Sequence, residues 1–566
     1  MRKKQVVPWF RSSGISTLCL LSSFVLAQGT GASPQDTSFS SSNLPIIVID
    51  THGQTIADEP KISADMGIIY NGEGVRNSIS DPFNNYQGKI GIEIRGSSSQ
   101  MFPKKQYAVE TRDTAGNDAS VSLLGLPEES DWVLSAPYND KSLMRDVLIY
   151  TLARRTGRYA SRAKYFELIL NREYMGVYIL LEKIKRNKNR VNISKLGPAD
   201  TTGDALTGGY ITKVDKVEGQ DTQGWYSKFP PYPYAWQKTL YQYHYPKQED
   251  IVSPQKTYIQ SFIDGFEATM NGPNYADSSL GYPRLTDIGS FVDVLLLNEL
   301  SKNVDGYRLS AFMYKDRDSK SGKLTMGPIW DYNHAFGNSD YYDASLIPGF
   351  QLTYLTTNSS FLKSDQFAVP FWWKKLFDEA AFANQCRRRW NELRKDQWSL
   401  SRITSVIDSV AALLDEARVR NFARWPVLGT YVWPNYFVGQ TYQQEIDYLR
   451  QWVRDRVSWL DGQWEATSVE AEQGDQGRTG EFSLSQNYPN PFNGGTTIRY
   501  VLPREAAVNV SIFDPLGRLM VSLLQSHQEA GHHQIFFDGS GLASGIYFYR
   551  IQAGGLVQAK ALLLLK

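Results

Sequence analysis

The sequence predicts an α+β protein that ends in a separate, small β-sandwich. Three stretches lead to this prediction: residues 88–96 alternate in apolar character, residues 287–303 are apolar nearly all round, and residues 482–566 form short alternating segments with turn residues between them. Alternation is typical of half-buried strands, whereas an apolar stretch of 17 residues indicates a buried helix. At 566 residues the chain is too long for one core, so we expect at least two cooperative units.

Composition limits the possible partners. The formal net charge is +1 and charged residues make up 21% of the chain. Such a balance provides no strong field for nucleic acid or for an anionic membrane, so we expect neither as a partner.

The N-terminus predicts export. Basic "MRKK" precedes the apolar run "ISTLCLLSSFVLA", and small residues end this run at Ala27, so residues 1–27 are predicted to be a signal peptide. A retained N-terminal anchor is the alternative. No later stretch of about twenty apolar residues predicts a transmembrane anchor in the mature chain. Cys386 is then the one cysteine of the mature chain, which excludes an intramolecular disulfide.

Two paired strands with a polar turn are expected near the start of the mature chain. Ile90, Ile92 and Ile94 fall on one face of the first strand, and residues 104–113 form its partner. The turn between the strands, "RGSSSQMFP", leaves several backbone amides free.

A helix and a hairpin follow these strands. The stretch "NDKSLMRDVLIYTLARRTGR" starts with Asn139 and Asp140 as possible N-caps and repeats apolar residues at helical spacing. The β-rich runs on either side of Asn171 and Arg172 predict a hairpin.

The rest of the first unit is predicted to combine an irregular stretch, a hairpin and a mostly helical segment. Residues 216–286 should be irregular apart from a helix at 253–270, and residues 307–331 should form a hairpin with "DRDSKSG" as its turn. Residues 370–461 fit a helical extension, and residues 462–481 have the composition of a linker.

Asp305 and Asp331 are the strongest candidates for chemistry. They flank the predicted hairpin, so both carboxylates fall at the same end of it and can share a metal ion. Asp and Asn oxygens suit Mg²⁺, which is commonly held by one or two carboxylates together with substrate phosphates. The alternative is that both acids are turn residues bonded to local amides. His334 fits a rim or packing residue, and no His and Cys spacing suits zinc.

Basic residues near the polar turn form a weaker candidate. The amides of "RGSSS", with Lys104 or Lys105, fit a phosphate cradle, although an ordinary hairpin explains the same pattern. Glu182, Lys183 and Lys213 end apolar strands, where each is either a ligand or a solvated strand end.

Four motifs in order resemble the spore-coat-protein-H-like (CotH) kinase family: "IEIRGSSSQMFPKKQYAVE", "LSAPYNDKSLMRDVL", "ELILNREYMGVYILLEKI" and "NVDGYRLSAFMYKD" with "GPIWDYNHAFGN". The resemblance covers roughly residues 85–350 of a predicted domain at 44–461. It implies a divergent, two-lobed protein-kinase-like fold that uses ATP and Mg²⁺. It also implies transfer of phosphate to Ser or Thr of surface or secreted proteins.

The resemblance assigns roles residue by residue. It implies that Asp305 is the catalytic base and that Asp331 is a Mg²⁺ ligand. Members of the family commonly carry a second acid two residues after the position of Asp331. This chain has Asn333 there, and its amide oxygen can still ligate Mg²⁺. The implied residues for nucleotide binding are Arg95, Lys105, Glu182, Lys213 and Trp330.

The tail resembles a second family. "NYPNPFNGGTTIRYVLP", "IFDPLGR", "LASGIYFYRI" and "KALLLLK" are similar to the type A C-terminal sorting domain of the type IX secretion system. This implies that residues 482–566 address the chain to that machinery, by way of the periplasm, for release or display at the cell surface. The alternative to an enzyme is a catalytically weak or inactive surface protein that binds glycan or protein through the aromatic-rich residues 216–286.

Overall fold

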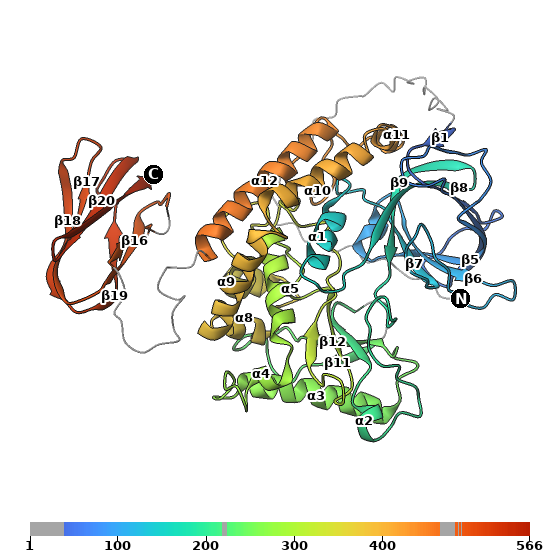
Figure 1. The fold of residues 1–566 in the computed structure, drawn as a ribbon, viewed down its shortest axis with the longest axis horizontal. Coiled ribbons are helices and arrows are strands. Elements are labelled where there is room, and N and C mark those ends of the chain that lie inside the picture. The colour runs from blue at the N-terminus through green and yellow to red at the C-terminus, as the bar shows by residue number, and fades with distance from the viewer. Residues whose placement is uncertain (1–38, 218–222, 465–481, 485, 488–489, 566) are drawn as a thin grey trace, which may run out of the picture.

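The computed structural model describes residues 39–217, 223–464 and 482–565, apart from 485 and 488–489. The predicted signal peptide and residues 465–481 of the predicted linker therefore lie outside the described residues. The described part is a mixed α+β structure with several sheets and a β-rich C-terminal region (Figure 1). No helix within it is long and apolar enough to cross a membrane.

The N-terminal part is a closed barrel of seven strands. Ile90 and Ile92 are fully buried inside it and Ile94 packs against the same cluster, which confirms the predicted strand. The barrel closes where its first strand, β2 (Ile46–Asp50), pairs in parallel with β8 (Ala163–Leu170). Around the barrel the order is β2 (Ile46–Asp50), β3 (Ile62–Ile69), β5 (Tyr86–Arg95), β6 (Gln106–Arg112), β7 (Asp131–Ser135), β9 (Glu173–Glu182) and β8 (Ala163–Leu170). A separate pair, β1 (Ser41–Ser42) and β4 (Asn77–Ser78), lies outside it.

The predicted hairpin and helix of this region are both present. Asn171 and Arg172 have φ of 51° and 70° and join β8 to β9, as a tight two-residue hairpin turn requires. Helix α1 (Arg145–Arg154) begins later than predicted. Asp140 still serves the helix start, because its carboxylate accepts the N–H of Arg145 at 2.8 Å. Asn139 has another role, described below.

A second, five-stranded sheet shows that the prediction for residues 216–286 was wrong. Besides the predicted helix α3 (Ser253–Asn271), this region contains two strands and the short helix α4 (Tyr282–Leu285). Trp225 packs against the core and stacks on buried Tyr241, but β11 has only three residues, too few to show an alternating pattern. The order in the sheet is β11 (Gly224–Tyr226), β12 (Leu240–Tyr245), β10 (Tyr210–Val214), β13 (Ala311–Lys315) and β14 (Leu324–Met326).

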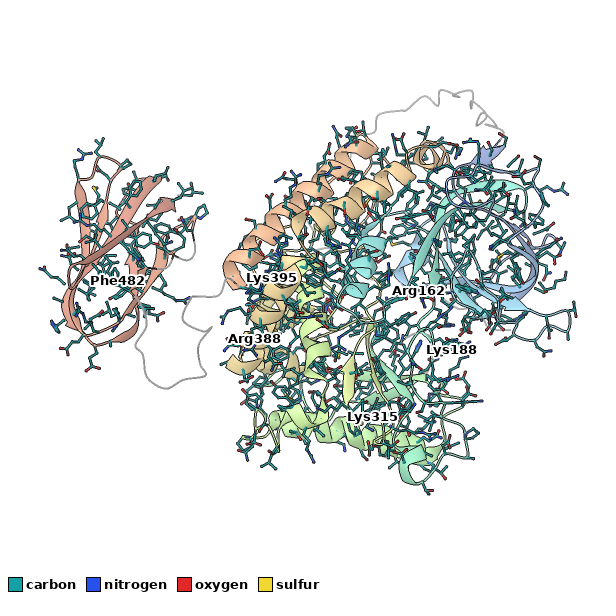
Figure 2. The ribbon with its side chains drawn as sticks, viewed as in Figure 1. Arg162, Lys188, Lys315, Arg388, Lys395 and Phe482 are labelled. Atoms are coloured by element: carbon teal, nitrogen blue, oxygen red, sulfur yellow. The ribbon has the colours of Figure 1, made fainter. Side chains whose placement is uncertain are left out.

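Helix α3 packs against one end of this sheet. Lys315, which Figure 2 labels, lies at the end of β13. Its ammonium group is 4.8 Å from the ring of Phe262. The same ammonium group donates to Asp318 Oδ1 at 2.7 Å. The predicted β13–β14 hairpin is thereby anchored to α3 at the end that carries its polar turn.

Helix α5 (Ile288–Ser301) is buried along nearly its whole length, as its sequence predicted. Buried Glu299 of α5 pairs with buried Arg456 of α12 at 3.2 Å, and Arg456 also donates to the Glu299 carbonyl at 2.9 and 2.7 Å. The other helices are α2 (Gly203–Leu206), α6 (Gln351–Thr357), α7 (Ser359–Ser364), α8 (Phe371–Phe377), α9 (Ala380–Lys395), α10 (Leu400–Leu413), α11 (Ala417–Arg424) and α12 (Tyr442–Trp464).

The C-terminal residues form the predicted β-sandwich. Two sheets share one core, to which Ile498 and Phe537 of one sheet and Val510 and Tyr549 of the other contribute. One sheet has the order β15 (Ser483–Leu484), β16 (Gly495–Leu502) and β19 (Gly531–Asp538); the other has β18 (Leu519–Gln528), β17 (Ala506–Phe513), β20 (Gly545–Ala553) and β21 (Leu556–Leu564).

Glu267 of α3 is a buried acid held by hydroxyl groups. It is 1% exposed and accepts hydrogen bonds from Ser227 at 2.6 Å and from Tyr241 at 2.8 Å. Burial raises the pKa of Glu267 from its usual 4.5 to about 7, against the opposing effect of the two hydroxyl groups. Between these two values the folded protein keeps a proton that the unfolded chain has released.

We expect this proton to make the fold less stable as pH rises. As pH rises from the usual pKa of 4.5 to the raised pKa of about 7, the free energy of unfolding should fall by about 3 kcal/mol in total. At higher pH this contribution should stay constant. The variant Glu267→Gln cannot ionise and should lack this part of the fall. Urea unfolding of both proteins across that range measures it, and an identical pH dependence in the two would contradict the prediction.

Candidate active site

A cleft of about 1110 Å³, open mouth included, brings together most of the predicted site residues. It lies where the loop after β5 meets the ends of β10 and β12 and the segments that flank the β13–β14 hairpin. The predicted residues that line it are Arg95, Lys213, Asp305, Trp330, Asp331 and Asn333.

The backbone at Asp331 is strained and held in place. Asp331 has φ of 68°, a left-handed conformation that is uncommon for a residue other than glycine. Its N–H donates to the hydroxyl group of Tyr150 at 3.1 Å, and the next N–H, of Tyr332, donates to Asp146 at 2.7 Å. Helix α1 thus fixes the turn that carries Asp331.

The carboxylate of Asp331 lacks a compensating partner. Within the described residues it makes no hydrogen bond or ion pair, and the side chain is exposed to the cleft. Loss of hydration raises the pKa of Asp331, and the nearby carboxylates of Asp305 and Asp215 raise it further. The basic groups of His334 and Arg95 act in the opposite direction. A cation placed here would satisfy the carboxylate.

Asp305, in contrast, is held by two basic side chains. Arg308 donates to its Oδ1 at 3.0 Å, and Nδ1 of His334 lies 3.7 Å from its Oδ2. Burial would raise the pKa of Asp305, but His334 and Arg308 bring it below its usual value. Arg308 also pairs with Asp365 at 2.9 Å, which ties Asp305 to the segment after α7.

Asn139, which the sequence suggested as a helix cap, instead bridges the site. Its side-chain oxygen accepts a hydrogen bond from Asn333 at 3.1 Å, and its side-chain nitrogen lies 3.1 Å from Nε2 of His334. His334 is therefore more than a rim residue. It connects Asn139 to Asp305.

Cations and aromatic rings cover the other side of the cleft. The guanidinium group of Arg95 lies 5.5 Å from the ring centre of Trp330, which stacks on Tyr150. Lys213 pairs with Asp215 at 2.9 Å. Lys183 lines the cleft as well, and the sequence did not favour it over a solvated strand end. These positive charges suit a polyanionic ligand.

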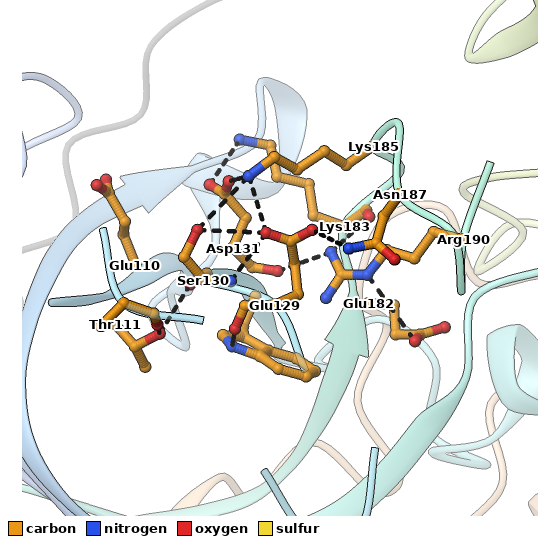
Figure 3. Close-up of polar contacts among 12 residues, drawn as sticks. Glu110, Thr111, Glu129, Ser130, Asp131, Glu182, Lys183, Lys185, Asn187 and Arg190 are labelled. Carbon is orange, nitrogen blue, oxygen red and sulfur yellow. Dashed lines mark hydrogen bonds and ion pairs between the residues drawn. The ribbon is translucent and has the colours of Figure 1, made fainter. Parts of the chain in front are cut away.

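Two of the residues implied for nucleotide binding lie away from this cleft. Glu182 is fully buried and pairs with Arg162 at 2.8 Å and with Arg190 at 3.8 Å. In Figure 3, Lys183 reaches toward Asp131 while Glu182 lies on the far side of Arg190. Figure 2 locates Arg162 beside the barrel. The other residue, Lys105, donates to the carbonyl of Gln100 at 2.6 Å and does not line the cleft.

The polar turn after β5 forms a single tight helical turn, Ser98–Met101, at the mouth of the cleft. Gly96 begins it with φ of 93°, and a Cβ atom there would lie 2.1 Å from Oγ of Ser99, so only glycine fits. Lys104 points elsewhere: it is buried and donates to the Val177 carbonyl at 2.6 Å. Burial lowers the pKa of Lys104 well below its usual value.

The sequence missed Asp146 of α1. Asp146 lines a smaller cavity that adjoins the cleft and shares Trp330 and Asp331 with it. Burial, and next the charge of Asp331, raise the pKa of Asp146 to about 7. An acid within the apolar pattern of a predicted helix was the only signal for it, and such residues usually face solvent.

The residues of the cleft fit Mg²⁺ bound together with phosphates. Asp331 offers an unpartnered carboxylate, and Asn333 uses its NH₂ group on Asn139, which leaves its side-chain oxygen without a partner among the described residues. No group of three or more His, Cys, Asp or Glu side chains in the described ranges could hold a metal alone. Oxygen donors in this small number match Mg²⁺ that keeps water and substrate phosphates as its other ligands.

Comparison with known protein families places the chain. It belongs to the CotH kinase protein family, whose match covers residues 92–460. Residues 486–564 match the secretion system C-terminal sorting domain. Both resemblances stated from the sequence are confirmed. A search of curated proteins found no match.

The two matches indicate a kinase-like protein that leaves the cell. The sorting domain directs the protein through the type IX secretion system to the cell surface or into the medium. The kinase match spans the barrel from β5 onward, the five-stranded sheet and the helices through most of α12.

We expect Asp331→Asn to preserve the fold. The carboxylate has no partner among the described residues and its pKa is raised, so its removal should lower the free energy of unfolding by no more than about 0.5 kcal/mol. A small increase in this free energy would also agree with the prediction. The matched control is Asp140→Asn, which breaks a buried pair with Arg145 and should cost about 3–5 kcal/mol. Urea unfolding of both variants tests this, and equal losses would show that Asp331 is a structural turn residue.

Proposed function

We propose that this protein is an exported, atypical protein kinase that transfers phosphate from ATP to Ser or Thr of surface or secreted proteins. The observation that carries the proposal is the cleft itself, in which Asp305, Asp331 and Asn333 lie together with Arg95 and Lys213. Membership of the CotH kinase family supports the reaction class. In this proposal the barrel acts as the nucleotide lobe, and the five-stranded sheet with its helices acts as the lobe that carries the acids.

The residues of the cleft have distinct roles in this proposal. Asp331 and Asn333 would hold Mg²⁺, which supplies charge neutralisation for the phosphates when it is bound. Arg95 and Lys213 would bind phosphate oxygens, and Trp330 would form one wall of the nucleotide site. Glu182 and Lys105, implied by the resemblance, would contribute only to the structure of the barrel.

Asp305 is suited to direct the acceptor hydroxyl group. In the transfer, the acceptor oxygen forms a bond to the γ-phosphorus, the bond to the ADP oxygen breaks, and Asp305 takes the hydroxyl proton. Arg308 and His334 keep Asp305 ionised and hold it in place before the acceptor arrives. Phosphoryl transfer depends mainly on such positioning.

A binding protein on the same scaffold is the second candidate. It is favoured by large exposed aromatic residues in the aromatic-rich region, where Tyr226, Tyr234 and Trp236 are 46%, 103% and 60% exposed. Much of that region is structural, however, because Trp225, Tyr241 and Tyr243 belong to or pack against the core. Thermal stabilisation by a polysaccharide, without an effect of Mg²⁺ and ATP, would favour this candidate.

We expect Asp305→Asn to lower phosphotransfer about 10²-fold or more, because the acceptor loses its base. Thermal stabilisation by Mg²⁺ and ATP should persist, which shows that the nucleotide site is intact. The matched control is Asp318→Asn, in the turn of the β13–β14 hairpin, which should remain active. The measurement is transfer of label from [γ-³²P]ATP to a surface-protein extract, and undiminished transfer by Asp305→Asn would refute its role as base.

We expect a chain that ends at residue 481 to remain in the periplasm with its phosphotransfer rate unchanged. The sandwich has its own core and carries the sorting signal, so the cleft does not depend on it. Immunoblots of periplasm, cell surface and medium measure the location. The converse control attaches residues 482–566 to a periplasmic reporter, which should then leave the cell. Export of the shortened chain would contradict the assignment.

A further inference from the structure

Four side chains that line the cleft lie in series, joined by one ion-pair contact and two hydrogen bonds. Oδ2 of Asp305 lies 3.7 Å from Nδ1 of His334, and Nε2 of His334 lies 3.1 Å from the side-chain nitrogen of Asn139. The side-chain oxygen of Asn139 accepts from the NH₂ group of Asn333 at 3.1 Å. The chain thus joins the proposed base to a proposed Mg²⁺ ligand.

The charge of Asp305 sets the direction of this chain. The negative carboxylate, 3.7 Å from Nδ1, attracts an N–H group there electrostatically, so it favours the imidazole tautomer with its proton on Nδ1. The hydroxyl group of Tyr341, 3.3 Å from Nδ1, can accept from the same N–H. Nε2 of a neutral His334 is then an acceptor, and Asn139 must present its NH₂ group to it.

The orientation of Asn139 decides the orientation of Asn333. With its nitrogen directed to His334, Asn139 presents its oxygen to Asn333, which must answer with its own NH₂ group. The oxygen of Asn333 is the atom left over. Asn333 lines the cleft beside Asp331, where an oxygen is a Mg²⁺ ligand and an amide nitrogen is not.

Asn139 is anchored through its backbone carbonyl group, so only the orientation of its side-chain amide can vary. It is 4% exposed, and its backbone carbonyl accepts from the side-chain nitrogens of Asn338 at 3.2 Å and Asn435 at 2.6 Å. Asn338 also donates to the carbonyl of Asn333 at 2.7 Å. A carbonyl group cannot donate, so both of these amides have one orientation.

We propose that Asn139 and His334 are positioning residues that carry the orientation imposed by Asp305 to Asn333 and so direct its oxygen into the cleft. The effect of this positioning on catalysis rests on the proposed kinase function. It also explains why an amide, where the family commonly has an acid, suits this chain. Aspartate at 333 cannot donate to Asn139, so Asn139 would turn, put its oxygen toward Nε2 and require a proton there.

Imidazole ¹⁵N chemical shifts test the proposal without nucleotide. The full chain, labelled with [¹⁵N]histidine, is studied at about pH 8.5, where an ordinary imidazole is neutral, and the His334→Gln spectrum identifies the His334 signals among the six histidines. We expect a proton on Nδ1 and none on Nε2. A proton on Nε2 in the wild type would overturn the proposal, whatever the activity.

Three variants distinguish an effect on the hydrogen-bond orientation from a general effect on folding. Asn139→Asp and Asn333→Asp each place an acceptor where the chain needs a donor, so both should put a proton on Nε2 of His334. Asn435→Ser is the control, because it contacts Asn139 through the backbone carbonyl and should leave the wild-type tautomer. A tautomer that is unchanged in both aspartate variants, or changed equally in the control, would overturn the proposal.

Kinetics then link the orientation to the reaction. Asn139→Asp should lower kcat by about tenfold to a hundredfold while KM for ATP changes by less than about threefold, because positioning and not nucleotide binding is lost. Equal activity of Asn139→Asp and wild type would overturn the positioning role. A wild type with the expected tautomer and no phosphotransfer would instead refute the kinase function and leave the hydrogen-bond order intact.

Discussion

The geometry of the cleft depends on the burial of Asn139. This residue is 4% exposed, so each of its polar atoms needs a partner inside the protein. Its partners come from two segments far along the chain: Asn333, His334 and Asn338 from the turn after β14, and Asn435 from the stretch before α12. The requirement to satisfy one buried amide thus brings the start of α1, the Asp331 turn and a late loop to the same place.

The charges near the cleft show where the protein tolerates an unfavourable arrangement. Asp140 pairs with Arg145, and Glu299 pairs with Arg456, each in a buried and neutralised contact. Among the described residues Asp331 has no such partner, and it sits on a strained backbone and has a raised pKa. An arrangement that costs stability is expected at a functional site, because a bound cation compensates for it.

The elements that could be predicted from the sequence are those whose structure is set by nearby residues, either through a repeating apolar pattern or through turn residues. The Ile90 to Ile94 strand, the apolar α5 and the Asn171–Arg172 turn have local causes and are present as predicted. The strands β11 and β12 were missed because β11 has only three residues, β12 buries residues on both of its faces, and β12 also pairs with β10, earlier in the chain. The pairing of strands separated by many residues leaves little trace in local pattern.

The same distinction applies to the site. The sequence alone determined that Asp305 and Asp331 flank one hairpin, that Asn333 follows Asp331 by two residues, and that the tail is an address. Only the tertiary structure decided that Lys213 and Arg95 reach the cleft while Glu182 is buried beside Arg162 and Arg190. A charged residue at the end of a strand faces one side or the other according to how its sheet is assembled, and for Arg95 and Glu182 that sheet is the closed barrel. That closure is made by the parallel pairing of β2 with β8, which no local pattern encodes.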